Sequence, residues 1–193
     1  MKETPNFTGW RVTVLHRSDA TTERLTRQLK LLGFRVTVQW TALDAAKLPD
    51  IILVDADQGW DELLPWSGAN APRPVVALLG SEAPGRIAWA MEQGSCTIIS
   101  KPITASAVYP ALVMAVSIHQ EREAVRNRLQ HLEERVRLRP LVHAAVQKIM
   151  AARLIDEEHA YSILRNCAMQ KRLPMEQVAA SIVGGAEPLP EAG

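Results

Sequence analysis

The sequence predicts a doubly wound α/β domain followed by an all-α region, and three observations support this division. Short apolar and β-branched runs alternate with helical patterns through the first hundred of the 193 residues. From about residue 105 to residue 183 no strand pattern remains. The charge changes as well: residues 1–104 hold eleven basic and eleven acidic side chains, whereas residues 122–172 hold eleven basic and six acidic ones. The formal net charge of +1 is therefore an average over two unlike parts.

The first part contains five candidate strands. Continuous apolar runs such as IILV and VVALL are typical of parallel strands that are buried on both faces. Between the first two strands, the segment Thr22–Leu32 places Leu25, Leu29 and Leu32 at helical spacing. Five strands in about a hundred residues predict a flavodoxin-like sheet, in which functional groups gather at the carboxyl ends of the strands. The candidate strands are Arg11–Leu15, Arg35–Trp40, Ile51–Val54, Val75–Leu79 and Thr97–Ile99.

Residues 105–139 carry the spacing of a long helix with a coiled-coil seam. Apolar side chains recur in alternating steps of three and four residues for more than four heptads, and Arg122 and Arg139 occupy two seam positions. This pattern predicts a homodimer, because the flanks of residues 121–137 are too charged to be buried all round. The alternative is one helix that packs against its own sheet. The apolar seam positions are Val108, Ala111, Ala115, Ile118, Val125, Leu129, Leu132 and Val136.

Residues 140–184 predict three short helices, and residues 185–193 a disordered tail. Pro140 has no backbone N–H, so it either kinks the long helix or opens a new one at its first position. Asp156 is a suitable N-cap for the second short helix. Gly184 and Gly185 end the third helix. The three helices are expected at Leu141–Ala152, Glu157–Met169 and Met175–Val183.

The first part resembles a response-regulator receiver domain. The features that carry the resemblance are the βα units, the run PDIILVDAD at the third strand, and SKP after the fifth. In that family the aspartate at the end of the third strand accepts phosphate and a lysine pairs with the phosphoryl group. The resemblance assigns these positions to Asp55 and Lys101, with Pro102 after the lysine. It implies no cofactor other than the Mg²⁺ that phosphorylation would require.

Several receiver positions are altered, which favours a degenerate receiver in which Asp55 and Lys101 are vestigial. His16 and Arg17 stand in the region where receivers carry the acidic pair that binds Mg²⁺, and a guanidinium opposes cation binding. Leu79 replaces the Ser or Thr at the end of the fourth strand, and Ile98 the usual aromatic residue of the fifth. One alternative is residual phosphorylation at Asp55. Another is a salt bridge from Arg17 to Asp55 that locks the domain.

Two tryptophans near the Asp55 loop are candidates for a protein-binding surface on this domain. Trp60 and Trp66 would anchor a protein partner if they are exposed, and would merely cover the core if they are not. The other tryptophans, Trp10, Trp40 and Trp89, adjoin predicted elements and are expected to be packing residues.

Residues 142–183 resemble the ANTAR domain, a three-helix output module of transcription antiterminators. The resemblance depends on the order of several short matches and on their spacing, although Val146-Gln147 replaces the usual Lys-Gly of the first helix. The matched positions are Ala145, Ile149, Met150, Ala160, Tyr161, Leu164, Arg165, Ala168, Met169, Val178 and Ala179.

The ANTAR resemblance implies binding to RNA hairpins of a nascent leader transcript. Small side chains on one helix face would admit a loop base or the phosphate backbone, and basic side chains would contact phosphates or stack on bases. The alternative is that the alanines are close helix–helix contacts and the basic residues a solvated face. The candidate RNA-binding residues are Lys148, Ala160, Arg165, Ala168, Met169, Lys171 and Arg172, with Arg153 as a further basic candidate.

A receiver, a coiled coil and an ANTAR domain in this order resemble the amidase-regulator class of antiterminators. That resemblance implies control by a ligand-sensing partner protein, with no enzymatic activity and no membrane partner. A phosphorylation switch at Asp55 and a dimeric adaptor without RNA are the competing hypotheses. No catalytic triad, phosphate loop or metal cluster emerges from the sequence. Two distant cysteines, no signal-peptide run and no span-length apolar stretch predict a cytoplasmic location.

Overall fold

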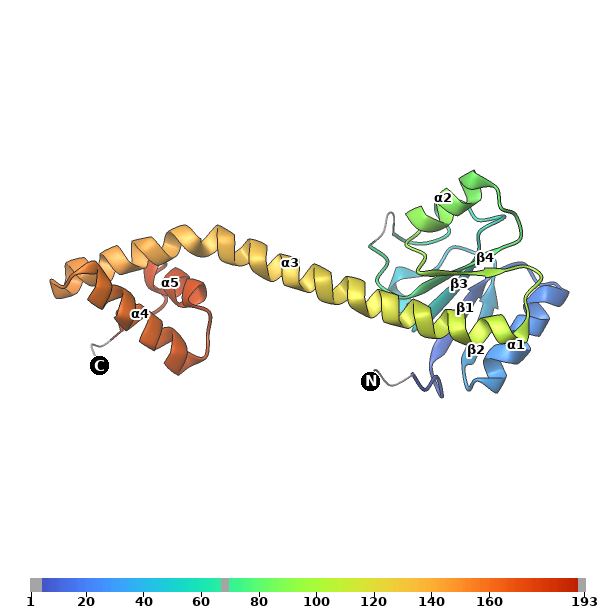
Figure 1. The fold of residues 1–193 in the computed structure, drawn as a ribbon, viewed down its shortest axis with the longest axis horizontal. Coiled ribbons are helices and arrows are strands. Elements are labelled where there is room, and N and C mark those ends of the chain that lie inside the picture. Colours follow the sequence, from blue (N-terminus) through green and yellow to red (C-terminus); the bar gives the residue numbers. More distant parts are fainter. Residues whose placement is uncertain (1–4, 67–69, 191–193) are drawn as a thin grey trace. The chain divides into compact units, whose positions relative to one another are not determined.

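The first part of the chain folds around a five-stranded parallel sheet with the order β2-β1-β3-β4-β5 (Figure 1). The computed structural model describes residues 5–66 and 70–190. Val12 of β1 pairs with Val36 of β2 and with Ile51 of β3, so β1 is an interior strand. This order confirms the predicted doubly wound sheet. The strands are β1 Arg11–Leu15, β2 Arg35–Gln39, β3 Ile51–Asp55, β4 Val75–Leu79 and β5 Thr97–Ser100.

Helices cover the two faces of the sheet unequally. One face packs against α1 and the first turns of α3, through Leu25, Leu29 and Leu112. The other packs against α2 and the long connections, through Trp89 and Leu63 (Figure 1). Only a 3-10 turn, η1, follows β2, and the described part of the β3–β4 connection contains no helix, so the run of five βα units is incomplete. The elements are α1 Ala20–Leu31, η1 Ala45–Lys47, α2 Pro84–Glu92 and α3 Ala105–Arg153.

Helix α3 runs without interruption through Pro140. Its 49 residues include both the predicted seam and the first of the predicted short helices, so Leu141–Ala152 is not a separate element. A proline removes one helical hydrogen bond, but the following turn gains burial through Ala145 and Ile149, which offsets that loss. The chain forms two compact units, residues 1–123 and 124–193, and their boundary falls within α3. The predicted boundary at 104/105 coincides with the start of α3 at Ala105, whereas the predicted boundary at 139/140 falls inside this helix.

The second unit is a small helical bundle formed by the end of α3, α4 (Glu157–Lys171) and α5 (Met175–Val183). Its core contains Ile149, Leu164 and Ile182. The Asp156 carboxylate caps α4 by accepting from the His159 backbone N–H at 2.9 Å, as expected of an N-cap. Arg172, with φ of 54°, ends α4 in the left-handed conformation.

The tail differs from the predicted disorder as far as Pro190. Leu189 packs against the core of the second unit, the Arg153 guanidinium donates to the Pro190 carbonyl, and Lys171 pairs with Glu187. The apolar side chain of Leu189 explains the difference, because burying it offsets the entropy of ordering the segment. Residues 191–193 of the predicted tail lie outside the described residues. In the described ranges, no helix combines the length and apolar character needed to cross a bilayer.

Candidate functional site

Asp55 lies at the carboxyl end of β3 and is only 1% exposed. The Lys101 ammonium, which follows β5, contacts Asp55 Oδ1 at 2.7 Å. His16 follows β1, and its Nε2 lies 3.2 Å from Asp55 Oδ2. Because β1 is the direct neighbour of β3, the strand order brings these side chains together at one edge of the sheet. The structure therefore places Lys101 beside Asp55, as the receiver resemblance implies.

His16 is an unexpected neighbour of Asp55. Its Nδ1 lies 2.7 Å from the carbonyl oxygen of Arg17 and 2.9 Å from the Thr22 hydroxyl. Nε2 is buried. In the described part of the chain it has no hydrogen-bond partner, and its 3.2 Å contact with Asp55 Oδ2 does not have the geometry of a hydrogen bond. The contact becomes an ion pair when the imidazole is protonated. Asp55 is thus flanked by nitrogen groups on both oxygens.

These residues do not fit a Mg²⁺ ion. Magnesium prefers oxygen ligands, yet one Asp55 oxygen faces an ammonium and the other an imidazole. The first carboxylate after β1, Asp19, is used as the N-cap of α1 and accepts from the Thr22 N–H at 2.8 Å. The described residues contain no group of three or more His, Cys, Asp or Glu side chains arranged to hold a metal.

Asp57 completes the cluster, although it was not among the site residues predicted from the sequence. Its carboxylate accepts from the Gly80 N–H at 2.8 Å and the Ser81 N–H at 3.1 Å, and it lies 3.1 Å from Lys101 Nζ. Partial burial of Asp57 opposes ionisation, but hydrogen bonds from Gly80, Lys101 and Ser81 outweigh it and lower the pKa of this carboxyl below its usual value. The signal was present in the run DAD, which places a second carboxylate two residues after Asp55.

Arg17 does not form the salt bridge to Asp55 that was one alternative. Its guanidinium lies over the Trp40 ring, 5.9 Å from the ring centroid, while His16 and Lys101 take the positions beside Asp55. A cation over an indole face is a favourable arrangement in itself. The side chains in contact with Asp55 are therefore those of His16 and Lys101.

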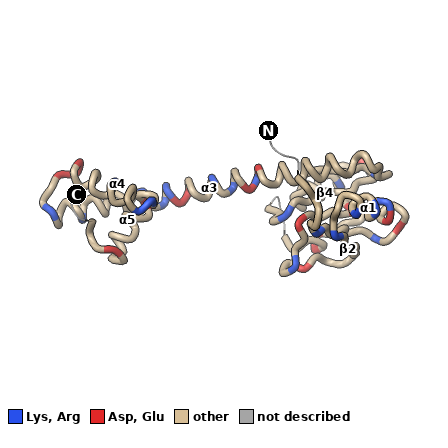
Figure 2. The backbone as a smooth tube through the Cα atoms, turned by 90° about the horizontal axis from the view of Figure 1, so that it is seen from below, with Lys and Arg blue, Asp and Glu red and all other residues tan. Residues whose placement is uncertain are grey.

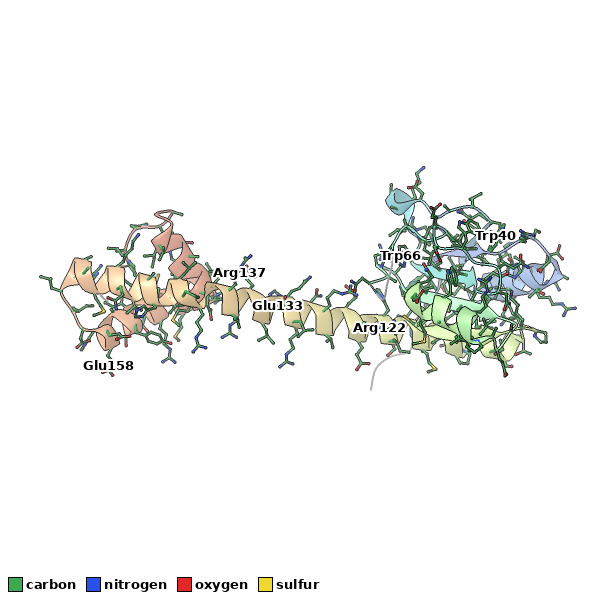
Figure 3. The ribbon with its side chains drawn as sticks, turned by 90° about the horizontal axis from the view of Figure 1, so that it is seen from above. Trp40, Trp66, Arg122, Glu133, Arg137 and Glu158 are labelled. Carbon is green, nitrogen blue, oxygen red and sulfur yellow. The ribbon has the colours of Figure 1, made fainter. Side chains whose placement is uncertain are left out.

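The tryptophans divide between packing and exposure. Trp66 is half-buried, and its Nε1 donates to the Gln93 carbonyl at 3.2 Å, which favours the covering role (Figure 3). Trp60 meets Trp40 edge-to-face and remains 37% exposed. Trp89 is buried, and Trp10 packs against the core, as predicted. Among these five side chains, Trp60 is the best placed to meet a partner.

The predicted seam has two parts with different environments. Val108 and Ala115 are buried in the core of the first unit, and Ala111 and Ile118 are partly buried, so here the helix packs against its own sheet. Arg122 also turns to that unit, where its guanidinium donates to the Gly94 carbonyl at 3.3 Å (Figure 3). Beyond Arg122 the apolar positions are exposed: Val125 and Leu129 by 54%, Leu132 by 46% and Val136 by 71%.

The charged residues of α3 lie beside this exposed part of the seam. Figure 2 shows basic and acidic positions interspersed along the helix between the two units. An exposed helix with such flanks and an apolar row at heptad spacing is the pattern of a coiled-coil strand.

The candidate RNA-binding residues also separate into groups. Ala160 and Ala168 are buried in the core of the second unit, so the interpretation as RNA contacts gives way to close helix–helix packing. The physical reason is that α4 turns its small side chains toward α3 and α5. The Lys148 ammonium donates to the Val183 carbonyl at 3.0 Å and so caps α5.

The remaining candidates lie on the outer surface of α4 and its C-terminus. Arg165, Met169 and Arg172 are exposed, and in the described ranges neither arginine side chain forms an ion pair. Lys171 is exposed as well but pairs with Glu187 of the tail. The surface available to a ligand is therefore formed mainly by Arg165, Met169 and Arg172.

Comparison with known proteins assigns both units. Residues 10–116, more than half of the chain, match the family described as AmiR, N-terminal. The chain belongs to the AmiR N-terminal family. Residues 130–183 match the ANTAR domain. The predicted combination of a receiver-like domain with an ANTAR domain is thus confirmed for this AmiR-type chain.

Two curated relatives cover most of the AmiR-type chain. The aliphatic amidase regulator of Pseudomonas aeruginosa is 27% identical over 177 residues, which are 90% of each protein. The transcriptional regulatory protein PdtaR of Mycobacterium tuberculosis is 26% identical over 143 residues, covering 72% of this chain and 70% of PdtaR. A signal receiver domain from Pseudomonas fluorescens has a TM-score of 0.49 at 19% identity, covering 64% of this chain and 97% of that domain. Both curated relatives are named as regulators.

Proposed function

We propose that this protein binds hairpins in nascent leader RNA and prevents transcription termination. The observation that carries the proposal is the ANTAR match over residues 130–183, on the same chain as a receiver-like unit of the AmiR family. The relatives are named as an amidase regulator and a transcriptional regulatory protein, which supports a role in gene regulation.

The RNA surface is the outer face of α4. Arg165 and Arg172 present guanidinium groups that the fold does not use elsewhere in the described ranges, and Met169 lies exposed between them in sequence. Guanidinium groups bind phosphate oxygens in bidentate geometry and stack on unpaired bases, which hairpin loops expose. Lys171 adds a cation when Glu187 leaves it.

The active form is a homodimer joined through α3. Val125, Leu129, Leu132 and Val136 form an exposed apolar row that a second copy of the helix would cover. Leu132 and Val136 also border a groove in the second unit, together with Val142 and Tyr161, which would extend the seam. A dimer carries two RNA surfaces, so two hairpins of one transcript bind with increased avidity.

Control passes through a ligand-sensing partner protein and not through phosphorylation. Asp55 is buried between Lys101 and His16, and the surrounding groups do not fit Mg²⁺. Incubation with Mg²⁺ and a small phosphodonor is expected to leave the protein unlabelled. Stoichiometric labelling that is lost in Asp55→Asn would refute control without phosphorylation.

The RNA proposal is tested by sequencing the RNA that co-purifies with the protein and measuring its affinity at several salt concentrations. We expect leader transcripts with paired hairpins. The double variant Arg165→Ala/Arg172→Ala should weaken binding and lower the slope of log affinity against log salt by roughly 1.4–1.8, since each lost phosphate contact removes about 0.7–0.9. The matched control, Arg24→Ala/Arg27→Ala on α1, removes the same charge from the other unit and should change neither the affinity for RNA nor its salt dependence. Absence of bound RNA at low salt would refute the proposal.

A further inference from the structure

The Asp57 carboxylate lies in a cradle of three donors from two different loops. The Gly80 and Ser81 N–H groups follow β4, and Lys101 follows β5. Oδ2 meets Gly80 N and Lys101 Nζ, while Oδ1 meets Ser81 N. Two successive backbone N–H groups together with an ammonium form a concave anion-binding arrangement. Both oxygens of Asp57 thus contact hydrogen-bond donors in the way that the oxygens of a bound anion would.

The fit between Asp57 and the backbone is close. A Cβ atom added at Gly80 would lie 3.1 Å from Asp57 Oδ2, which is tighter than ordinary contact. The carboxylate therefore approaches the backbone at a point that glycine leaves open.

The same cradle borders Asp55. Lys101 Nζ joins the two carboxylates, at 2.7 Å from Asp55 Oδ1 and 3.1 Å from Asp57 Oδ2, and the Asp57 N–H donates to Asp55 Oδ1 at 3.0 Å. Any anion placed on or beside Asp55 would need these donors, and Asp57 already takes them. A second anion there would also meet the negative charge of Asp57 at short range.

We propose that Asp57 is a built-in anionic ligand, which fills a site for a small tetrahedral oxyanion of the phosphate class. The tethered carboxylate holds the loops after β3, β4 and β5 in their anion-bound arrangement without any modification of the chain. It also keeps external phosphate out. Removal of the Asp57 carboxylate turns the cradle into a phosphate site. This inference concerns the first unit alone and is independent of RNA binding.

The test is titration of the full chain with inorganic phosphate, observed through the backbone amide resonances of Gly80 and Ser81. The wild-type resonances should stay in place. In Asp57→Ala both should shift saturably, with phosphate binding tighter than in the wild type by roughly tenfold or more, because a like charge at contact distance has been removed. Asp57→Ala/Lys101→Ala should lose the response. The matched control, Glu82→Ala, removes an exposed carboxylate from the same loop and should behave as the wild type.

Site-resolved amides separate this cradle from phosphate bound by the basic second unit. If Asp57→Ala does not fold, Asp57→Asn retains an oxygen acceptor without the charge and should show a weaker response at the same two amides. A saturable shift of Gly80 and Ser81 in the wild type equal to that of the variant would overturn the proposal. So would folded Asp57→Ala or Asp57→Asn protein whose two amides do not respond to phosphate.

Discussion

Replacing Lys101 by methionine should destabilise the first unit strongly, because this lysine compensates a carboxylate that is almost fully buried. Asp55 is 1% exposed, and the Lys101 side chain is only 19% exposed, so water screens the pair weakly. Breaking a buried ion pair by removing one partner typically costs about 3–5 kcal/mol. In Lys101→Met the two carboxylates of Asp55 and Asp57 would also face each other without the intervening ammonium. We therefore expect the free energy of unfolding of Lys101→Met to fall by an amount in the upper part of that range.

The assay is urea unfolding at neutral pH, followed by tryptophan fluorescence, since all five tryptophans lie in the first unit. The control Lys47→Met removes an exposed lysine of η1 and should change the free energy of unfolding by less than about 0.5 kcal/mol.

The double variant Asp55→Asn/Lys101→Met isolates the electrostatic part of the loss. Without a charge on Asp55, the missing ammonium matters less, so the double variant should be more stable than Lys101→Met alone. A loss below about 1 kcal/mol in Lys101→Met would refute this account. A double variant no more stable than the single one would refute it as well.

Three further predictions follow from other parts of the chain. Because its neighbours lower the pKa of Asp57, this carboxylate stabilises the fold above the ordinary carboxyl pKa, and the stabilisation is lost as the pH falls through the lowered pKa. The free energy of unfolding, measured at decreasing acidic pH, should therefore fall less in Asp57→Asn than in the wild type. Parallel curves for the two proteins would contradict this. Leu129→Asp should weaken dimerisation roughly 100-fold or more in sedimentation experiments, since each of the two chains loses the burial of a leucine worth about 1.5–3 kcal/mol. Gln130→Asp, one residue off the seam, should have little effect. An equal effect of both changes would place the interface elsewhere. Leu164→Ala should destabilise the helical bundle by about 2–5 kcal/mol through the cavity it leaves, measured by thermal unfolding of the helical signal, and a near-wild-type midpoint would show that the site collapses.

The strands could be predicted because burial on both faces leaves a continuous apolar run. Ile51 to Val54 and Val75 to Leu79 are such runs, and both are fully buried strands in the structure. The pairing of Asp55 with Lys101 could be predicted for a different reason: the resemblance to receivers assigned both positions. Spacing alone does not bring together residues that are 46 positions apart.

The side chains around Asp55 could not be derived in the same way. His16 and Arg17 are adjacent, and which of them faces Asp55 depends on how the chain leaves β1. Asp57 depends on the path of the loop after β3, which brings its carboxylate to the N–H groups of Gly80 and Ser81. Loop geometry of this kind is set by tertiary contacts and leaves no periodic pattern in the sequence.

The second unit shows that a helical pattern in the sequence does not decide whether its small residues face a ligand or a neighbouring helix. Small residues such as Ala160 and Ala168 suit both a ligand surface and close helix packing, and only their burial decides between the two. Whether Pro140 kinks the long helix, opens a new one or leaves it continuous could not be decided from the sequence, and in the structure the helix continues. Packing of the turns after the proline, through Ala145 and Ile149, offsets the local loss of one hydrogen bond.

The connectivity of the sheet bears on how the chain folds as it is synthesised. Every strand pair is parallel, and the pairing of Val12 with Ile51 joins residues about forty positions apart. Such non-local pairs form slowly, whereas the short α4 and α5 helices contact near neighbours and form fast. One face of the sheet, which α1 covers only in part, also stays incomplete until Val108, Leu112 and Ala115 of α3 have emerged from the ribosome. The first unit therefore closes late, when the start of α3 docks against it, and the seam residues, which follow that segment in the chain, leave the ribosome later still.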